Sequence, residues 1–116
     1  MKKLIQSIVL VMLVVISITG YSQTVNSVEK LEIKTSAQCD MCKQTIEKAM
    51  AYEKGVKSFD LNVETATLTV EYVTKKTTPE KIREAVTKVG YDADEMPADK
   101  KAYDNLPGCC KKGGHN

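Results

Sequence analysis

Two alternating stretches joined by a very short link place the strongest constraint on how this chain can fold. Apolar and polar side chains alternate in residues 56–63, and residues 66–73 repeat the pattern. An alternation with a period of two predicts half-buried strands. Because only Glu64 and Thr65 connect the two stretches, we expect the strands to pair as an antiparallel hairpin. Any fold of this chain should therefore contain a sheet built on this hairpin.

One further strand and two helices flank the hairpin along the chain. Residues 28–35 alternate between apolar and polar side chains, which predicts another half-buried strand. Residues 40–53 carry apolar side chains at spacings of three and four, which is typical of an amphipathic helix. A second helix is expected between Pro79 and Gly90. Here Thr78 is a capping residue, proline favours the first helical position and glycine favours the end.

The resulting order of strand, helix, strand, strand and helix predicts an α+β fold. In such a fold an antiparallel sheet carries both helices on one face. A split βαβ arrangement adds a fourth strand after the second helix, and residues 92–97 occupy that position here. Three acidic residues and a proline make this segment a poor strand. We therefore expect a fourth strand to be short and to lie at an edge, and we expect a short helix in residues 98–106.

The first 22 residues are typical of a cleaved secretory signal rather than of a folded element. A short basic start precedes a mostly apolar run at residues 4–18, and small residues follow at Gly20 and Ser22. This pattern predicts a signal peptide, residues 1–22, that is cut before Gln23. The apolar run is shorter than the roughly 20 residues that a spanning helix needs. We therefore expect a periplasmic or secreted protein with no stable membrane anchor after cleavage.

The charge balance argues against a nucleic-acid partner. The chain has 17 basic and 15 acidic residues, and removal of the two lysines of the signal leaves the two signs equal in number. A nucleic-acid-binding protein needs a basic face, which a near-neutral chain does not predict. The acidic residues near Asp92 and the lysine pairs at 75–76 and 111–112 are expected to be solvated surface.

The most reactive residues of the chain form a pair, Cys39 and Cys42, at the predicted turn from the first strand to the first helix. Free N–H groups and the helix dipole at this position lower the pKa of a thiol, and the thiolate is the form that binds metals. Soft thiolates select ions such as Cu(I) and Zn(II). Two sulfurs suit Cu(I) or Hg(II), whereas a structural Zn(II) site usually has four ligands. We therefore favour Cu(I), followed by Hg(II), carried in a form that an incoming thiol could take over.

The same cysteine pair permits two other interpretations. It could act as a thiol–disulfide redox pair, or it could form an inert disulfide in an oxidising compartment. The sequence around it disfavours a thioredoxin-like protein, because only one strand precedes the pair and no aromatic residue flanks it. In addition, no proline stands before a later strand, since Pro79 opens a helix. We identify no nucleophile–base pair, phosphate-binding loop or paired catalytic carboxylates, and we do not interpret the chain as an enzyme.

Residues spread over positions 28–96 resemble the heavy-metal-associated domain family. The resemblance is carried by Cys39-x-x-Cys42, Ile46-Glu47-x-Ala49, Gly55-Val56, the hairpin and Gly90-Tyr91-x-Ala93. This family includes small copper chaperones, the periplasmic mercury-binding protein and modules of metal-pumping ATPases. The resemblance implies a ferredoxin-like βαββαβ fold and one soft ion bound between Cys39 and Cys42. It also implies a metal-transporting membrane ATPase or another metal-binding protein as partner, and a function in metal trafficking or detoxification.

Three residues near the pair refine what the resemblance implies. Tyr91 matches a tyrosine that lies near the metal in the bacterial copper chaperones of the family. The family usually has a methionine two residues before the first cysteine, whereas this chain has Ala37, so packing beneath the loop should differ. Met41, between the two cysteines, is expected to pack against the site or shield it.

The end of the chain carries a second cysteine pair. We divide the chain after the signal into a flexible N-terminus at 23–27, a heavy-metal-associated domain at 28–96 and a tail at 97–116. The tail contains Cys109 and Cys110, a composition typical of a metal-binding end. One hypothesis is that the tail folds over the loop and adds one or two thiolates, which would shift the preference towards Zn(II) or Cd(II). The alternative is a disordered tail whose cysteines oxidise or bind metal loosely.

Overall fold

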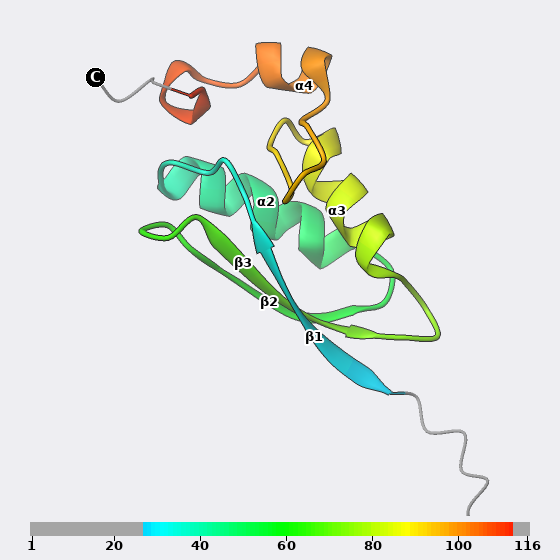
Figure 1. Ribbon diagram of the computed structural model, residues 1–116. Helices are drawn as coiled ribbons and strands as arrows, with labels where there is room; N and C mark the ends of the chain where they lie inside the picture. Colours follow the sequence, from blue (N-terminus) through cyan, green and yellow to red (C-terminus); the bar gives the residue numbers. More distant parts are fainter. Residues whose placement is uncertain (1–26, 113–116) are drawn as a thin grey trace, which may run out of the picture.

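The computed structural model describes residues 27–112 of the 116-residue chain. The predicted signal peptide, residues 1–22, lies outside the described residues. The elements run in this order: β1 (Val28–Lys34), α2 (Asp40–Tyr52), β2 (Val56–Asn62), β3 (Thr67–Val73), α3 (Pro79–Lys88), α4 (Lys100–Asp104) and the 3-10 helix η1 (Gly108–Cys110). Figure 1 shows them in sequence colours. Within the described residues, every helix is too short or too polar to cross a membrane.

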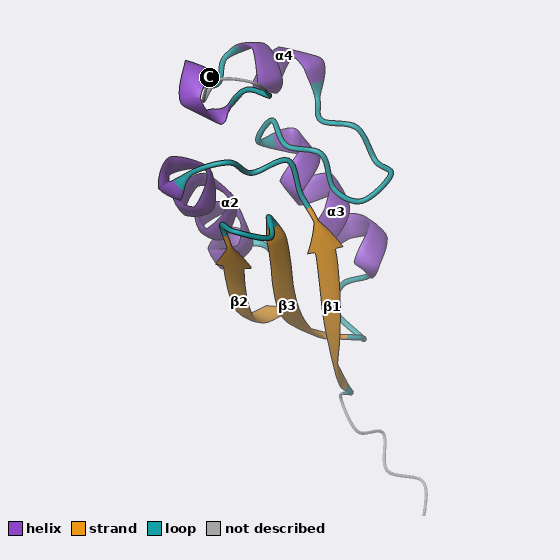
Figure 2. Cartoon of the chain, turned by 60° about the vertical axis from the view of Figure 1, so that its left-hand side comes forward, coloured by secondary structure: helices purple, strands orange, loops and turns teal. Residues whose placement is uncertain are grey.

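The three strands form one antiparallel sheet in the order β1-β3-β2. Figure 2 shows β3 at the centre of the sheet, with α2 and α3 side by side over one face. The predicted hairpin is the β2–β3 pair, and β1 adds to the other edge of β3. The α+β class and the ferredoxin-like sandwich predicted from the sequence are both confirmed.

The core lies between the sheet and the two helices. The inward face of β3 is apolar along its whole length, and α2 and α3 each contribute residues spaced four apart. The fully buried members are Ile33 from β1, Leu61 from β2, Leu68 and Val70 from β3, Cys42, Ile46 and Met50 from α2, and Ile82 and Val86 from α3. Each buried aliphatic side chain contributes about 1.5–3 kcal/mol to the free energy of folding. Because the buried residues occupy the apolar positions of the predicted strands and helices, the periodicity of the sequence accounts for the two layers.

The position of the fourth strand is occupied by a single antiparallel bridge between Ala93 and Thr35. Beside it, the Asp94 N–H donates to the Lys34 carbonyl at 2.8 Å. The Lys34 N–H in turn donates to Asp94 Oδ1 at 2.9 Å. Asp94 has a φ of 53°, a left-handed conformation that aspartate tolerates, and the chain then folds back to Met96. The expectation of a short fourth element at a sheet edge is confirmed.

The link between β2 and β3 is longer than the predicted Glu64-Thr65 connection, because β2 ends one residue earlier than predicted and β3 begins one residue later. The last cross-strand pair is Asn62 with Thr67. Ala66 adopts a φ of 56° and so belongs to the turn. Its carbonyl accepts bonds from both the N–H and the hydroxyl of Thr35, each 2.8 Å long. These bonds tie the hairpin tip to the end of β1, just before the cysteine loop.

The tail packs against the end of α3 and runs back over the start of α2, as the orange and red ribbon in Figure 1 shows. The close approach occurs at Gly90, which has a φ of 104°. A Cβ atom at this position would lie 3.0 Å from the Ala102 carbonyl oxygen and 3.1 Å from Leu106 Cδ1. The Asp99 N–H also donates to the Thr87 carbonyl at 3.0 Å. The described part of the tail is therefore an ordered layer, and the predicted short helix is α4.

Candidate metal centre

The loop between β1 and α2 brings Cys39 and Cys42 together. Cys39 is the N-cap residue of α2 in an extended conformation, and Cys42 lies in the first turn with its side chain buried. The two Sγ atoms are 3.2 Å apart, and all four cysteines of the chain are free thiols. Beneath the loop, Ala37 is buried and its N–H donates to Thr35 Oγ1 at 3.2 Å, so a small residue packs where the family usually has methionine.

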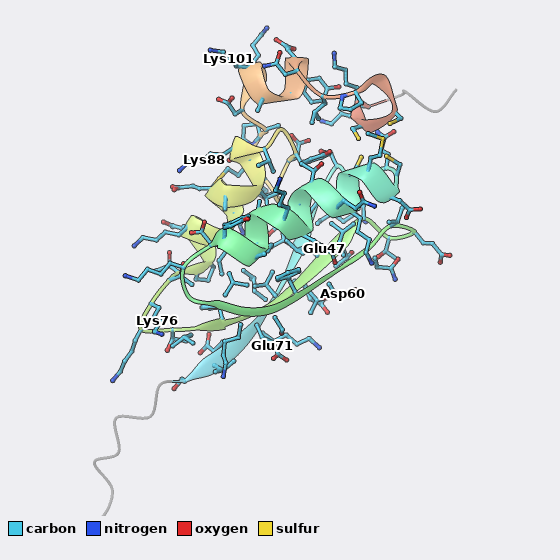
Figure 3. All side chains as sticks on the ribbon, turned by 180° about the vertical axis from the view of Figure 1, so that it is seen from behind. Glu47, Asp60, Glu71, Lys76, Lys88 and Lys101 are labelled. Atoms are coloured by element: carbon cyan, nitrogen blue, oxygen red, sulfur yellow. The ribbon has the colours of Figure 1, made fainter. Side chains whose placement is uncertain are left out.

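The tail places its two cysteines against this pair. Cys110 Sγ lies 3.6 Å from Cys39 Sγ, and Cys109 Sγ lies 3.8 Å from the same atom. The Sγ atoms of Cys39, Cys42 and Cys110 all lie within 4.8 Å of one another. Figure 3 shows the sulfur atoms gathered between the start of α2 and η1. We call the four cysteines the thiol cluster.

The two tail cysteines differ in their surroundings. Cys110 is only 2% exposed and belongs to the hydrophobic core. Cys109 is half-buried, and its Sγ lies 3.7 Å from the Sδ atom of Met41. Met41 is itself 51% exposed and covers the outer side of the cluster at Cys109. The buried side of the cluster is thus formed by Cys42 and Cys110.

The cluster holds one thiol that ionises easily. Burial alone would raise the pKa of Cys39. Hydrogen bonds from the Cys42 backbone N–H and from the thiols of Cys42, Cys110 and Cys109 nevertheless lower it to about 6. Burial raises the pKa of Cys110, and its contact with Cys42 adds to this increase. The Cys39 thiol therefore ionises more readily than a free thiol, and thiolate sulfur is a soft donor that suits a soft ion.

Tyr91 lies beside the thiol cluster, as the resemblance implied. Its side chain is completely buried, and its hydroxyl has no hydrogen-bond partner among the described residues. Burial raises the pKa of Tyr91, and so do the neighbouring thiols of Cys110 and Cys42. A buried hydroxyl without a partner is unusual in a folded protein. Here the hydroxyl is a donor placed next to the sulfur atoms of Cys42 and Cys110.

A small set of polar contacts anchors the tail, and we call it the tail clamp. Lys112 Nζ lies 2.6 Å from Asp92 Oδ2, and the Lys112 N–H donates to the Tyr103 hydroxyl at 3.0 Å. Asp92 Oδ1 accepts from the Ala98 N–H at 2.9 Å, and the Asp92 N–H donates to Ser36 Oγ at 2.9 Å. The Lys112 ammonium holds the pKa of Asp92 below its usual value. Lys112 is 61% exposed, as expected of solvated surface, whereas Asp92 is partly buried, and the pair also joins the tail to the cysteine loop.

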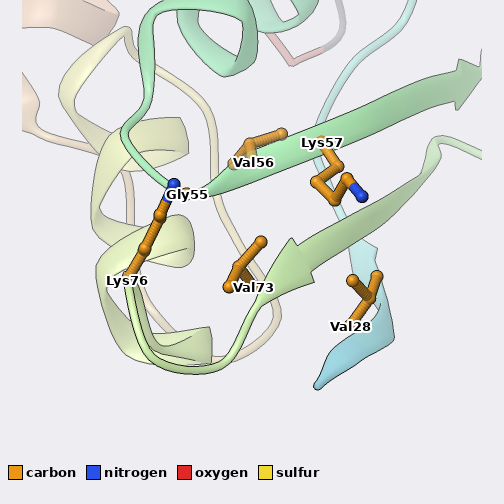
Figure 4. Close-up of a pocket in the computed structure, with 6 residues that line it drawn as sticks. All are labelled: Val28, Gly55, Val56, Lys57, Val73 and Lys76. Atoms are coloured by element: carbon orange, nitrogen blue, oxygen red, sulfur yellow. The ribbon is translucent and has the colours of Figure 1, made fainter. Parts of the chain in front are cut away.

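A shallow pocket lies at the end of the sheet away from the start of α2. Figure 4 shows its lining residues, which are Val28, Gly55, Val56, Lys57, Val73 and Lys76. Neither aliphatic side chains nor lysine ammonium groups bind soft metals. This pocket therefore offers no ligands for a soft ion, in contrast to the thiol cluster.

Comparison with known proteins gives a consistent result for the core of the chain. The model of the heavy-metal-associated domain matches residues 35–92. The chain is 37% identical over 54 residues to the copper chaperone CopZ of Staphylococcus epidermidis, which covers 47% of this chain and 79% of that protein. It is 41% identical over 63 residues to copper-transporting ATPase 1 of Rattus norvegicus, which covers 54% of this chain and 4% of the ATPase.

Solved structures support the same fold. The structure of oxidized MerP from Ralstonia metallidurans superimposes with a TM-score of 0.57 at 25% identity, and covers 59% of this chain and 96% of that one. The chain thus spans most of the small relatives and a very small part of the ATPase. The range matched by the family model contains Cys39, Cys42 and Tyr91, and it ends before Cys109 and Cys110.

Proposed function

The chain belongs to the heavy-metal-associated domain family, and we propose that it carries a soft metal ion, with Cu(I) the favoured cargo. The ion is held by Cys39 and Cys42. The observation that carries this proposal is the convergence of two free thiols, 3.2 Å apart, at the start of α2. Thiolate sulfur selects soft ions over hard ones, and a helix start favours the negative charge of the thiolate. The copper chaperone among the relatives supports the choice of copper.

The arrangement also suits transfer of the cargo. Cys42 is buried, whereas Cys39 is half-buried at the loop, so an approaching thiol can reach the ion from the side of Cys39. In such an exchange the new sulfur–metal bond forms as the bond to Cys39 breaks, and the ion keeps its charge throughout. The protein would thus act by carriage rather than by catalysis.

The similarity to copper ATPases and the pattern of the first 22 residues support a partner and a location for the protein. Copper-transporting ATPases are among the relatives, which supports a metal-transporting membrane ATPase, or another metal-binding protein, as the source or the recipient of the ion.

The pattern of residues 1–22 supports export to the periplasm or the outside of the cell. Fractionation of cells and measurement of the intact mass test this: the exported form should begin at Gln23, and a full-length cytoplasmic form would contradict export.

Anaerobic native mass spectrometry of the reduced protein tests the metal-binding role. Wild type and the Cys39→Ala/Cys42→Ala variant would each be offered Cu(I), Zn(II) and Hg(II). We expect one soft ion per wild-type chain, retained best for Cu(I), and no retained ion in the double variant. Full binding by the double variant would overturn the assignment of the two cysteines.

A thiol–disulfide redox role is the alternative, because the low pKa of Cys39 also suits disulfide exchange. The reduction potential of the Cys39–Cys42 pair distinguishes the two functions. A potential near those of dedicated oxidants, together with turnover on a reduced substrate protein, would contradict metal carriage.

A further inference from the structure

The starting observation is that the thiol cluster contains more sulfur than a two-ligand site uses. Cys110 is 2% exposed, and its Sγ atom lies 3.6 Å from Cys39 Sγ. The Sγ atoms of Cys39, Cys42 and Cys110 all lie within 4.8 Å of one another. The family match ends before this residue. A buried thiol that points into a candidate metal site needs an explanation that the pair alone does not provide.

The spacing of the sulfur atoms indicates how many ligands the cluster can present. With metal–sulfur bonds of about 2.3 Å, two sulfurs on opposite sides of an ion lie about 4.6 Å apart, whereas three at trigonal corners lie about 4.0 Å apart. The Sγ separations from Cys39 are 3.2 Å to Cys42 and 3.6 Å to Cys110. A linear site would have to spread the Cys39–Cys42 pair widely. A trigonal site requires a much smaller expansion of both distances.

We propose that Cys110 is the third ligand of the site, so that the protein holds its soft ion in a three-coordinate thiolate cage. This inference rests on the proposed function, since Cys39 and Cys42 supply the other two ligands. Cys109 is the outer thiol: it is half-buried and contacts Met41, and it does not coordinate the ion. The tail is therefore part of the binding site rather than an appendage.

The position of Cys110 is prepared by protein contacts that need no metal. The tail clamp joins Lys112 to Asp92, and Asp92 in turn bonds to Ser36 in the cysteine loop. The close packing of Ala102 on Gly90 fixes the other end of the tail. A ligand that is already in place adds affinity because little conformational freedom is lost when it binds.

The surroundings of Cys110 also provide for the extra negative charge. Three thiolates around a monovalent ion leave the site anionic. The buried Tyr91 hydroxyl lies beside Cys42 and Cys110 and has no partner among the described residues. A hydrogen bond from this hydroxyl to a thiolate would satisfy the donor and stabilise the charge.

X-ray absorption spectroscopy of the protein loaded with one equivalent of Cu(I) tests the proposal. The matched pair of variants is Cys110→Ser and Cys109→Ser, which change neighbouring thiols in the same way. We expect three sulfur neighbours around copper in wild type and in C109S, and two in C110S. In competition with a Cu(I) chelator, C110S should bind at least about tenfold more weakly than wild type, and C109S should lose much less affinity than C110S.

Two sulfur neighbours in wild type, or equal Cu(I) affinities for wild type and C110S, would overturn the role of Cys110. The wild-type sulfur count needs no variant, so it decides the question even if C110S disturbs the tail. Failure of the proposed function has a different signature: wild type binds no soft ion, or the Cys39→Ala/Cys42→Ala variant keeps its ion. Binding that needs Cys39 and Cys42 but remains two-coordinate overturns only the third ligand.

Discussion

The cysteine loop and the tail bring thiols to the same point by different means. The loop lies inside the segment matched by the family model, and Thr35 ties it to the hairpin tip through two bonds to Ala66. The tail lies outside the matched segment and is held by the tail clamp and by one close approach at Gly90. The sheet and helices thus determine where Cys39 lies, whereas the tail clamp, the contact at Gly90 and the burial of Cys110 itself determine where Cys110 lies. The comparison indicates that two parts of the chain that are held in different ways can bring thiols to the same point.

The largest expected effect comes from removing core support beneath the loop. Ile46 is fully buried on α2, and Ile46→Ala should destabilise the protein by about 2–5 kcal/mol through the lost burial and the cavity that remains. Chemical denaturation measures this change. Tyr52 is 82% exposed on the same helix, and Tyr52→Ala is the control, with an expected change within about 0.5 kcal/mol. Equal losses would show that α2 is not held by the packing described above.

A smaller effect, confined to the tail, is expected at Gly90. Gly90→Ala introduces a Cβ 3.0 Å from the Ala102 carbonyl oxygen at a φ of 104°, which should cost about 1–3 kcal/mol. We expect Cys110 to react faster with a thiol reagent while Cys42 keeps its protection, as mass spectrometry of labelled peptides can measure. Gly108→Ala is the control, because a Cβ there meets nothing within 4 Å. Unchanged labelling of Cys110 in G90A would contradict the anchoring role of this contact.

The tail clamp should contribute less, because Lys112 is largely exposed. Asp92→Asn removes the charge that holds Lys112, and we expect a loss of about 1 kcal/mol or less. The reactivity of Cys110 should rise modestly and the reactivity of Cys42 should not. Lys100→Met removes the exposed pair with Asp104 and should change neither thiol. If D92N and K100M behave alike, the clamp does not position the tail.

The smallest effect concerns Asp94, which lies beside the bridge between Thr35 and Ala93, and it depends on pH. Burial alone would raise the pKa of Asp94. The Arg83 guanidinium and the Lys34 N–H nevertheless bring it below its usual value. These bonds therefore stabilise the fold fully above the unfolded pKa of about 3.9, and their contribution is lost as the pH falls through the lower folded pKa.

Asp94→Asn makes that prediction measurable. The variant keeps a residue that tolerates the left-handed conformation at this position, and it should be about 0.5–1 kcal/mol less stable than wild type at neutral pH. Thermal unfolding should show that the difference shrinks as both proteins are acidified below about pH 4. A difference that persists unchanged in acid would show that the charge of Asp94 is not its source.

The sequence predicted the layers well because apolar periodicity reports directly which side of a strand or helix is buried. The alternation in residues 66–73 corresponds to the inward face of β3, and the capping residue Thr78 starts α3 as expected, with its side chain accepting from the Lys81 N–H. The hairpin link was placed less well. Ala66 adopts a left-handed conformation that alanine rarely favours, so nothing local indicates that it leaves the strand.

The chemistry of the site was also readable in part. Two cysteines before a helix indicate a thiolate pair. The tail cysteines indicate a second set of donors, but the sequence does not indicate where in the fold they lie. Their position depends on Lys112 meeting Asp92 and on Gly90 lying under Ala102. Charged residues occur throughout the chain, and no spacing rule connects these two. Contacts of this kind, between distant side chains, become visible only when the chain is folded.

Competition for Cu(I) against a chelator tests the account most directly when three reduced proteins are compared. These are wild type, Cys39→Ala/Cys42→Ala and Cys109→Ala/Cys110→Ala. We predict that wild type binds one ion tightly, that the loop double variant binds none, and that the tail double variant binds one ion at least about tenfold more weakly than wild type. Retention of wild-type affinity by the loop double variant would contradict the central claim that Cys39 and Cys42 hold the cargo.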